Sequence, residues 1–133
     1  MRRTALGAVV MLIVSLPLAA CSEDTPAVCT SVDDLRASVQ SVKDVDVRSS
    51  GGLGELEDAV AAVKSDLADV RDDAADEFSS QIDTVQAGIA ELERSLRAAQ
   101  DAVSTDTLRA AASALSTLAN QVQSLIDDIR ATC

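Results

Sequence analysis

The stretch that decides the fold is residues 53–103, which read LGELEDAVAAVKSDLADVRDDAADEFSSQIDTVQAGIAELERSLRAAQDAV. It contains no proline, and its large apolar residues recur every three or four positions almost throughout. That spacing places them along one narrow stripe of an α-helix. The stripe consists of Leu53, Leu56, Val60, Val63, Leu67, Val70, Phe78, Ile82, Val85, Ile89, Leu92, Leu96 and Val103.

We predict one long central helix over about residues 53–103. At 1.5 Å per residue it spans roughly 75 Å, so other helices must lie along it to bury the stripe.

The repeat is interrupted once, because Ala74, Phe78 and Ile82 are spaced four and four. Such spacing either rotates the stripe around the helix or marks a break in the helix. No Gly or Pro stands nearby, so we predict continuity. The alternative is a break near Ser79, which gives an up-down four-helix bundle.

Shorter helices are predicted on either side of the long one. Ser31 can cap the first, which covers about 31–47, and Ser and Gly residues at 48–52 mark a turn. Thr105 can cap the last, which covers about 106–132 and repeats the same apolar spacing. The predicted fold class is therefore all-α, an antiparallel helical coiled coil or bundle.

The composition excludes several classes of function. With 11 basic and 22 acidic residues the formal net charge is −11, which repels nucleic acid and anionic headgroups. The chain has no His, Trp or Tyr and a single Phe, so the commonest general base and the aromatic platforms for sugars or bases are missing. We therefore predict that the protein is not an enzyme, uses no cofactor and binds no nucleic acid.

The first residues have the layout of an export signal. Arg2 and Arg3 form a basic start, residues 5–16 are almost uninterruptedly apolar, and Pro17 ends that run. The run is shorter than the about 20 residues that a transmembrane helix needs.

The residues that follow, Leu18-Ala19-Ala20-Cys21, resemble the lipobox of bacterial lipoproteins. This resemblance implies that residues 1–20 are a removed signal peptide and that Cys21 becomes an N-terminus thioether-linked to diacylglycerol. Residues 21–28 are then a lipidated tether before a helical domain at 29–133. The protein is expected outside the cytoplasm, on the outer face of the cell membrane or in an outer membrane. The alternative is a secretory signal with an incidental cysteine.

With Cys21 lipidated, Cys29 and Cys133 remain, and we predict a disulfide between them. If the first helix folds back along the first half of the long helix, Cys29 lies level with about Val70. If the last helix folds back along the second half, Cys133 lies level with about Glu77. Free thiols or a bridge to another chain are the alternatives.

One metal-binding pattern occurs near the first turn. Asp44, Asp46 and Glu55 stand at the first, third and twelfth positions of a calcium-loop spacing. The fifth position is Arg48, a cation where an oxygen ligand is needed, and the sixth is Ser49, where that loop needs glycine. We interpret the segment as a solvated acidic turn and predict no metal site.

Together these features predict a membrane-anchored lipoprotein that acts without catalysis, by protein–protein contact or as an envelope spacer. In outline the chain resembles the small helical lipoproteins of cell envelopes. It ends Ala131-Thr132-Cys133 and so lacks the C-terminal Lys that the major outer-membrane member uses for attachment to the wall. The expected partners are the membrane and another envelope protein, and the oligomeric state stays open. The alternative is a ligand- or metal-binding accessory subunit of a transporter or sensor.

Overall fold

A computed structural model describes residues 25–133 of the chain. Its elements are α1 (Ala27–Asp44), α2 (Gly52–Asp73), the short 3₁₀ helix η2 (Asp76–Phe78), α3 (Ser79–Asp101) and α4 (Thr105–Arg130). No strand occurs in this part of the chain. The predicted all-α helical bundle is therefore confirmed.

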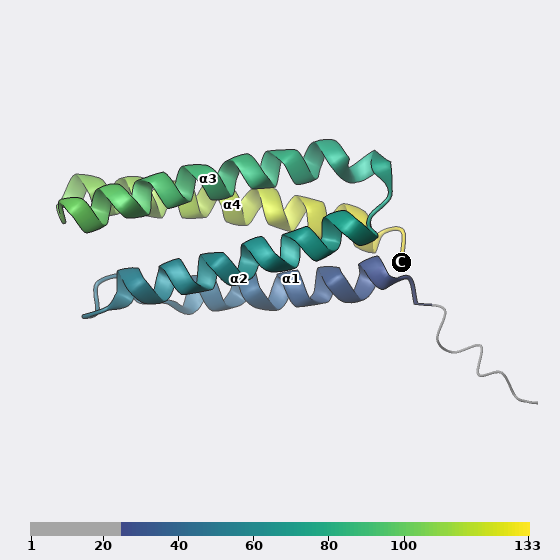
Figure 1. The fold of residues 1–133 in the computed structure, drawn as a ribbon, viewed down its shortest axis with the longest axis horizontal. Coiled ribbons are helices and arrows are strands. Elements are labelled where there is room, and N and C mark those ends of the chain that lie inside the picture. The colour runs from purple at the N-terminus through teal and green to yellow at the C-terminus, as the bar shows by residue number, and fades with distance from the viewer. Residues whose placement is uncertain (1–24) are drawn as a thin grey trace, which may run out of the picture.

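The helices form an up-down bundle made of two helical hairpins (Figure 1). α1 packs mainly on α2, α3 packs mainly on α4, and the hairpins meet through α2–α3 and α1–α4 contacts. The turns within the hairpins lie together at one end, termed the far end (residues 44–54 and 99–109). The start of α1, the α2–α3 link and the C-terminus lie at the opposite end, termed the disulfide end (27–33, 70–83 and 126–133).

The long helix predicted over residues 53–103 is broken in the middle, so the prediction of continuity is wrong. α2 ends before Ala74, and Ala74 and Ala75 adopt extended backbone, with φ/ψ of −77°/149° and −67°/156°. The alternative, a four-helix bundle with a break near Ser79, describes the structure. The break falls a few residues earlier than Ser79, and no side-chain hydrogen bond caps α3.

Burial explains why the chain folds back although no helix breaker is present. In a straight rod each half of the stripe would contact only one other helix. Folding at Ala74 and Ala75 gives every helix two neighbours and removes nearly all of the stripe from water. A fully buried Val, Leu or Ile contributes about 1.5–3 kcal/mol, whereas a lost backbone hydrogen bond costs about 1 kcal/mol. Tertiary packing therefore overrides the helix preference of the link.

The core contains aliphatic side chains from all four helices. Most of them are no more than 2% exposed, and Phe78 lies among them at the disulfide end with 9% exposed. Two stripe residues differ: Leu53 is only partly buried, and Val103 is 70% exposed. Both belong to the far end, so the core is less well covered there.

Two helix starts differ from the prediction. α1 begins at Ala27, so Ser31 lies inside the helix, where its hydroxyl is 3.2 Å from the Ala27 carbonyl and donates to a carboxylate of α2. α4 is capped by Ser104 and not by Thr105. Ser104 Oγ accepts a hydrogen bond from the Thr107 N–H (3.1 Å), and Thr107 Oγ1 accepts one from the Ser104 N–H (3.0 Å). This reciprocal arrangement satisfies N–H groups that the helix cannot pair itself.

The turn between α1 and α2 depends on glycine. Gly51 has a φ of +85°, in the left-handed region that a Cβ disfavours. Gly52 lies against the turn, and a Cβ there would be 2.1 Å from the Asp46 carbonyl oxygen. Asp46 closes the same turn, because its carboxylate accepts from the Arg48 N–H (2.9 Å) and its carbonyl from the Ser49 N–H (3.1 Å).

Replacing Gly52 by alanine is expected to lower the free energy of unfolding by about 1–3 kcal/mol, because the added Cβ displaces the Asp46 carbonyl. Gly54 is the matched control, since no atom lies within 4 Å of a Cβ built there. Gly54→Ala should raise stability by about 0.5–1 kcal/mol through helix propensity. Urea unfolding followed by circular dichroism measures both variants, and equal shifts would contradict the close approach.

Candidate functional site

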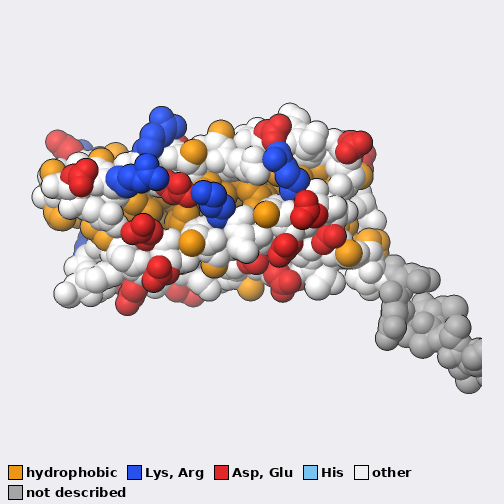
Figure 2. Space-filling view, in the orientation of Figure 1, with side chains coloured by type: hydrophobic (Ala, Val, Ile, Leu, Met, Phe, Trp, Pro, Cys, Tyr) orange, Lys and Arg blue, Asp and Glu red, His pale blue; other side chains and the backbone are white. Residues whose placement is uncertain are grey.

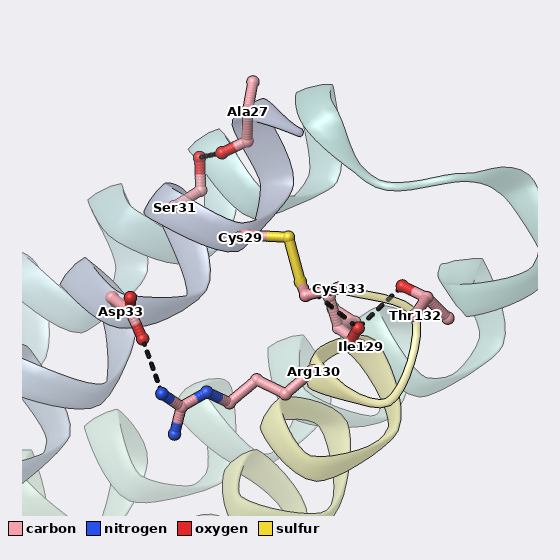
Figure 3. The surroundings of a disulfide bond; sticks show 8 residues. All are labelled: Ala27, Cys29, Ser31, Asp33, Ile129, Arg130, Thr132 and Cys133. Carbon is pink, nitrogen blue, oxygen red and sulfur yellow. Dashed lines mark hydrogen bonds and ion pairs between the residues drawn. A yellow bond between two sulfur atoms is a disulfide. The ribbon is translucent and has the colours of Figure 1, made fainter. Parts of the chain in front are cut away.

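The disulfide end is closed by a covalent bond between distant parts of the chain. Cys29 in α1 and Cys133 after α4 form a disulfide with an S–S distance of 1.99 Å and a Cα–Cα distance of 6.2 Å, across 104 residues (Figure 3). Cys29 is buried and Cys133 is exposed. Beside the bridge, the Arg130 guanidinium reaches the Asp33 carboxylate (3.3 Å). The bond fastens the start of the first hairpin to the end of the second.

Side-chain contacts also link every pair of neighbouring helices near this end. They are Ser31–Asp73 between α1 and α2, Arg71–Asp83 between α2 and α3, Gln81–Asp128 between α3 and α4, and Arg130–Asp33 between α4 and α1. Each exposed ion pair contributes at most about 1 kcal/mol. Because they surround the bundle, they hold all four helices in register at the disulfide end.

The far end has weaker links and more apolar surface. Within residues 25–133, the one side-chain hydrogen bond between helices near it runs from Gln100 Nε2 to Glu57 Oε2 (2.9 Å). Val103 is 70% exposed there. Further aliphatic side chains in or next to this end are only partly buried, namely Val45, Val47, Leu53, Leu108 and Leu115.

A cavity of about 450 Å³ opens at the far end, between the α1–α2 turn and the first turns of α4. Val47, Leu108 and Ala112 form its apolar lining, and Arg48 and Arg109 also line it. A smaller cavity of about 100 Å³ shares the three apolar residues and extends it toward the core. The larger cavity is lined by no carboxylate, thiol or imidazole, so it is suited to binding an aliphatic group and not to acid–base chemistry.

The face formed by α2 and α3 carries basic side chains along a band of apolar ones (Figure 2). Lys64 and Glu93 form an ion pair across it (3.3 Å), and hollows of about 220 and 330 Å³ both include this pair in their lining. The apolar residues beneath, such as Val60 and Leu96, are no more than 2% exposed. The large apolar side chains of this band are therefore covered, whereas Val103 is 70% exposed at the far end, which makes the far end the stronger candidate for a contact site.

The residues of the calcium-loop pattern lie around the α1–α2 turn. Asp44 is the last residue of α1 and Glu55 lies in the first turn of α2. The Asp46 carboxylate accepts the hydrogen bond from the Arg48 N–H and so serves the turn itself. In the part of the chain that the structure describes, no three His, Cys, Asp or Glu side chains are arranged to hold a metal ion.

The predicted lipidation site, Cys21, and the predicted signal peptide, residues 1–20, lie outside the described residues. The described chain begins at the disulfide end, just before α1. Among residues 25–133, no helix is both long enough and apolar enough to cross a lipid bilayer.

The sequence analysis did not identify the far end as a surface. Val45, Val47 and Val103 carried the available signal, because they are aliphatic residues in or beside turns, where polar residues are usual. Their association with Leu108 and Ala112 required the tertiary structure.

No family model, curated protein or solved structure matches this chain. The two ends of the bundle are therefore judged on their own geometry and chemistry.

Cys29→Ser is expected to lower the melting temperature under oxidising conditions, because it removes a bridge across 104 residues. Loss of such a bond costs about 2–5 kcal/mol, or roughly 10 °C or more for a domain of this size. Thermal melts followed by circular dichroism test this. Cys21→Ser is the matched control and should melt like the wild type, whereas reduced wild type should melt like Cys29→Ser. An unchanged melting temperature for Cys29→Ser would refute the role of the bridge.

Proposed function

We propose that this chain is a membrane-anchored extracytoplasmic lipoprotein that acts without catalysis, by contact with another envelope protein or as an envelope spacer. The lipobox-like Leu18-Ala19-Ala20-Cys21 supports the anchor. The observation that carries the proposal is the position where the bundle begins. α1 starts at Ala27, so only residues 22–26 separate Cys21 from the disulfide end. A lipid on Cys21 would hold that end within about 20 Å of its attachment point.

An upright bundle would carry the far end well away from the lipid. α4 has 26 residues, and helices of this length span about 39 Å at 1.5 Å per residue. The net charge of −11 opposes contact of the helix faces with anionic headgroups. Both features support a short rigid spacer whose outer tip is the far end.

The far end has the chemistry of a protein contact surface. Partly covered aliphatic side chains surround a cavity, and contiguous apolar surface on a soluble protein commonly marks an interaction site. Arg48 and Arg109 add guanidinium groups, which are enriched at interfaces. The partner that fits is an envelope protein with an aliphatic side chain for the cavity and polar or acidic groups beside it.

Ligand binding, as an accessory subunit of a transporter or sensor, is the second candidate function. The cavity of about 450 Å³ lies within the size range of small-molecule sites. Its apolar lining and Arg48 and Arg109 fit an aliphatic carboxylate. Calorimetric titration with a medium-chain fatty acid tests this, and binding should be lost in Ala112→Trp, which fills the cavity. The absence of binding to the wild type would remove this candidate.

Cys21→Ser is expected to move the full chain from the membrane to the soluble fraction of a bacterial host that processes lipoproteins, because the acyl anchor is lost. Ser22→Ala is the matched control and should remain in the membrane fraction. Mass spectrometry of the wild type should show a chain that starts at Cys21 and carries diacylglycerol. An unacylated chain that retains Met1 would contradict the proposal.

A photo-crosslinking amino acid at Val103 is expected to capture an envelope protein from intact cells, because Val103 is exposed at the far end. The same probe at Glu77, exposed at the disulfide end, is the control and should give much less of that adduct. Leu108→Asp should abolish the Val103 adduct by placing a charge in the cavity. Equal adducts from both positions would argue against a contact surface at the far end.

A further inference from the structure

The link between α2 and α3 bends at two residues, Ala74 and Ala75, that are not turn formers. Residues 71–77 read RDDAADE, and in this segment only Ala74 and Ala75 have extended backbone. Alanine is the strongest helix former, whereas tight chain reversals normally use Gly, Pro, Asn, Asp or Ser at the bend. The bend at the two alanines is therefore imposed by the packing of the hairpins and not by the local sequence.

The apolar stripe becomes continuous if the link is helical. Val70, Ala74, Phe78 and Ile82 are spaced by four residues, so in a straight helix each lies about 40° round from the one before, in a stripe that is continuous but slants around the helix. Moving Ala74 and Ala75 into the α region would join α2 and α3 into one helix. The large backbone change falls on these two alanines, and the 3₁₀ turn Asp76–Phe78 needs only a smaller adjustment to become α-helical.

Each hairpin would keep its own packing in the opened chain, because α1 packs mainly on α2 and α3 mainly on α4. Opening removes only the α2–α3 and α1–α4 contacts between hairpins. A second opened copy restores them, since the α1–α2 hairpin of one copy fits the α3–α4 hairpin of the other. The Arg71–Asp83 and Arg130–Asp33 pairs would re-form between the copies, because both join different hairpins.

We propose that this chain forms a dimer by exchanging hairpins with a second copy, with Ala74 and Ala75 as the hinge. Cys29 and Cys133 belong to different hairpins, so exchange places Cys29 of one copy beside Cys133 of the other. Each bridge forms when two protein thiols react with one oxidised glutathione, which leaves as two molecules of reduced glutathione. The disulfide preserves the arrangement that is present when it forms, which is either the closed monomer or the exchanged dimer.

The variant Ala75→Pro distinguishes the closed monomer from the hairpin-exchanged dimer, because proline is compatible only with the first. In the closed turn Ala75 has a φ of −67° and Ala74 before it is extended, so proline fits both. Inside a continuous helix proline costs about 3 kcal/mol, which corresponds to roughly a hundredfold in population for each of the two hinges in the exchanged dimer. Ala75→Ser is the matched control, because residue 75 is exposed and serine leaves both backbone conformations accessible.

The experiment uses the full chain in mild detergent, with Cys21→Ser in every variant so that Cys29 and Cys133 are the only thiols. Equal amounts of ¹⁵N-labelled and unlabelled reduced chains are denatured together and refolded at high concentration with oxidised and reduced glutathione. Mass spectrometry then counts Cys29–Cys133 peptide pairs that join a labelled to an unlabelled chain. A non-reducing gel measures the covalent dimer.

We expect mixed pairs from the parent chain and from Ala75→Ser, and at least about a hundredfold fewer from Ala75→Pro, because the exchanged dimer has two hinges. The Ala75→Pro monomer should melt no lower than the parent, which shows that it folds. Insertion of Gly-Ser-Gly after Ala75 is a second variant that relaxes the closed turn and should also reduce the mixed pairs. Absence of mixed pairs from the parent chain, or equal amounts from Ala75→Pro, would overturn the proposal.

Discussion

Burial of narrow aliphatic stripes is the interaction on which the rest of the structure depends. A helix with one apolar residue in every three or four positions is covered only when other helices lie on both sides of its stripe. The chain has a single Phe and no Trp or Tyr, so no large rings fill gaps and the helices must approach closely. Leu35, Leu67, Leu92 and Leu125, one from each helix, are at most 1% exposed. The reversal at Ala74 and Ala75 follows from this requirement.

The two ends of the bundle differ in how they are held. At the disulfide end, Cys29–Cys133 and a ring of polar contacts tie all four helices together. A thin bundle has a small margin of stability, so a covalent bond between the ends of the fold has a large share in it. At the far end the cover is incomplete and Val103 and Leu108 reach the surface. Attachment through Cys21 at the fastened end would leave the more open end available for contact.

The bundle is also modular, since each hairpin has more contact within itself than with its neighbour. Such an arrangement determines which helix surfaces pack together. It does not determine equally strongly whether the two hairpins come from one chain or from two. The turn at Gly51 and Gly52 is different, because positive φ and close approach require glycine there and fix the reversal locally. The α2–α3 link has no such requirement, so its conformation depends on what packs around it.

Local patterns in the sequence were sufficient to predict a large part of the secondary structure and of the core. The spacing of three and four residues identified the helical state and the stripe residues from Leu56 to Leu96. This is possible because helix periodicity depends only on residues that are close in the sequence. With Cys21 assigned to the lipid anchor, the positions of Cys29 and Cys133 at the two ends of the helical region predicted the pair that the structure joins. The start of α1 was misplaced, because Ser31 resembles a cap in sequence but in the fold contacts α2.

The sequence by itself determined that the protein is helical and which faces are apolar, and it favoured the cysteine pair that the structure joins. Only the tertiary structure decided that the chain breaks at Ala74, since the two alanines favour a helix and the burial that bends them requires both hairpins. It alone also brought Val47 and Leu108 into one cavity, because residues far apart in the chain have no local signal for their contact. Spacing along the chain encodes local conformation, whereas the choice among ways of burying the same stripe depends on the whole assembled core.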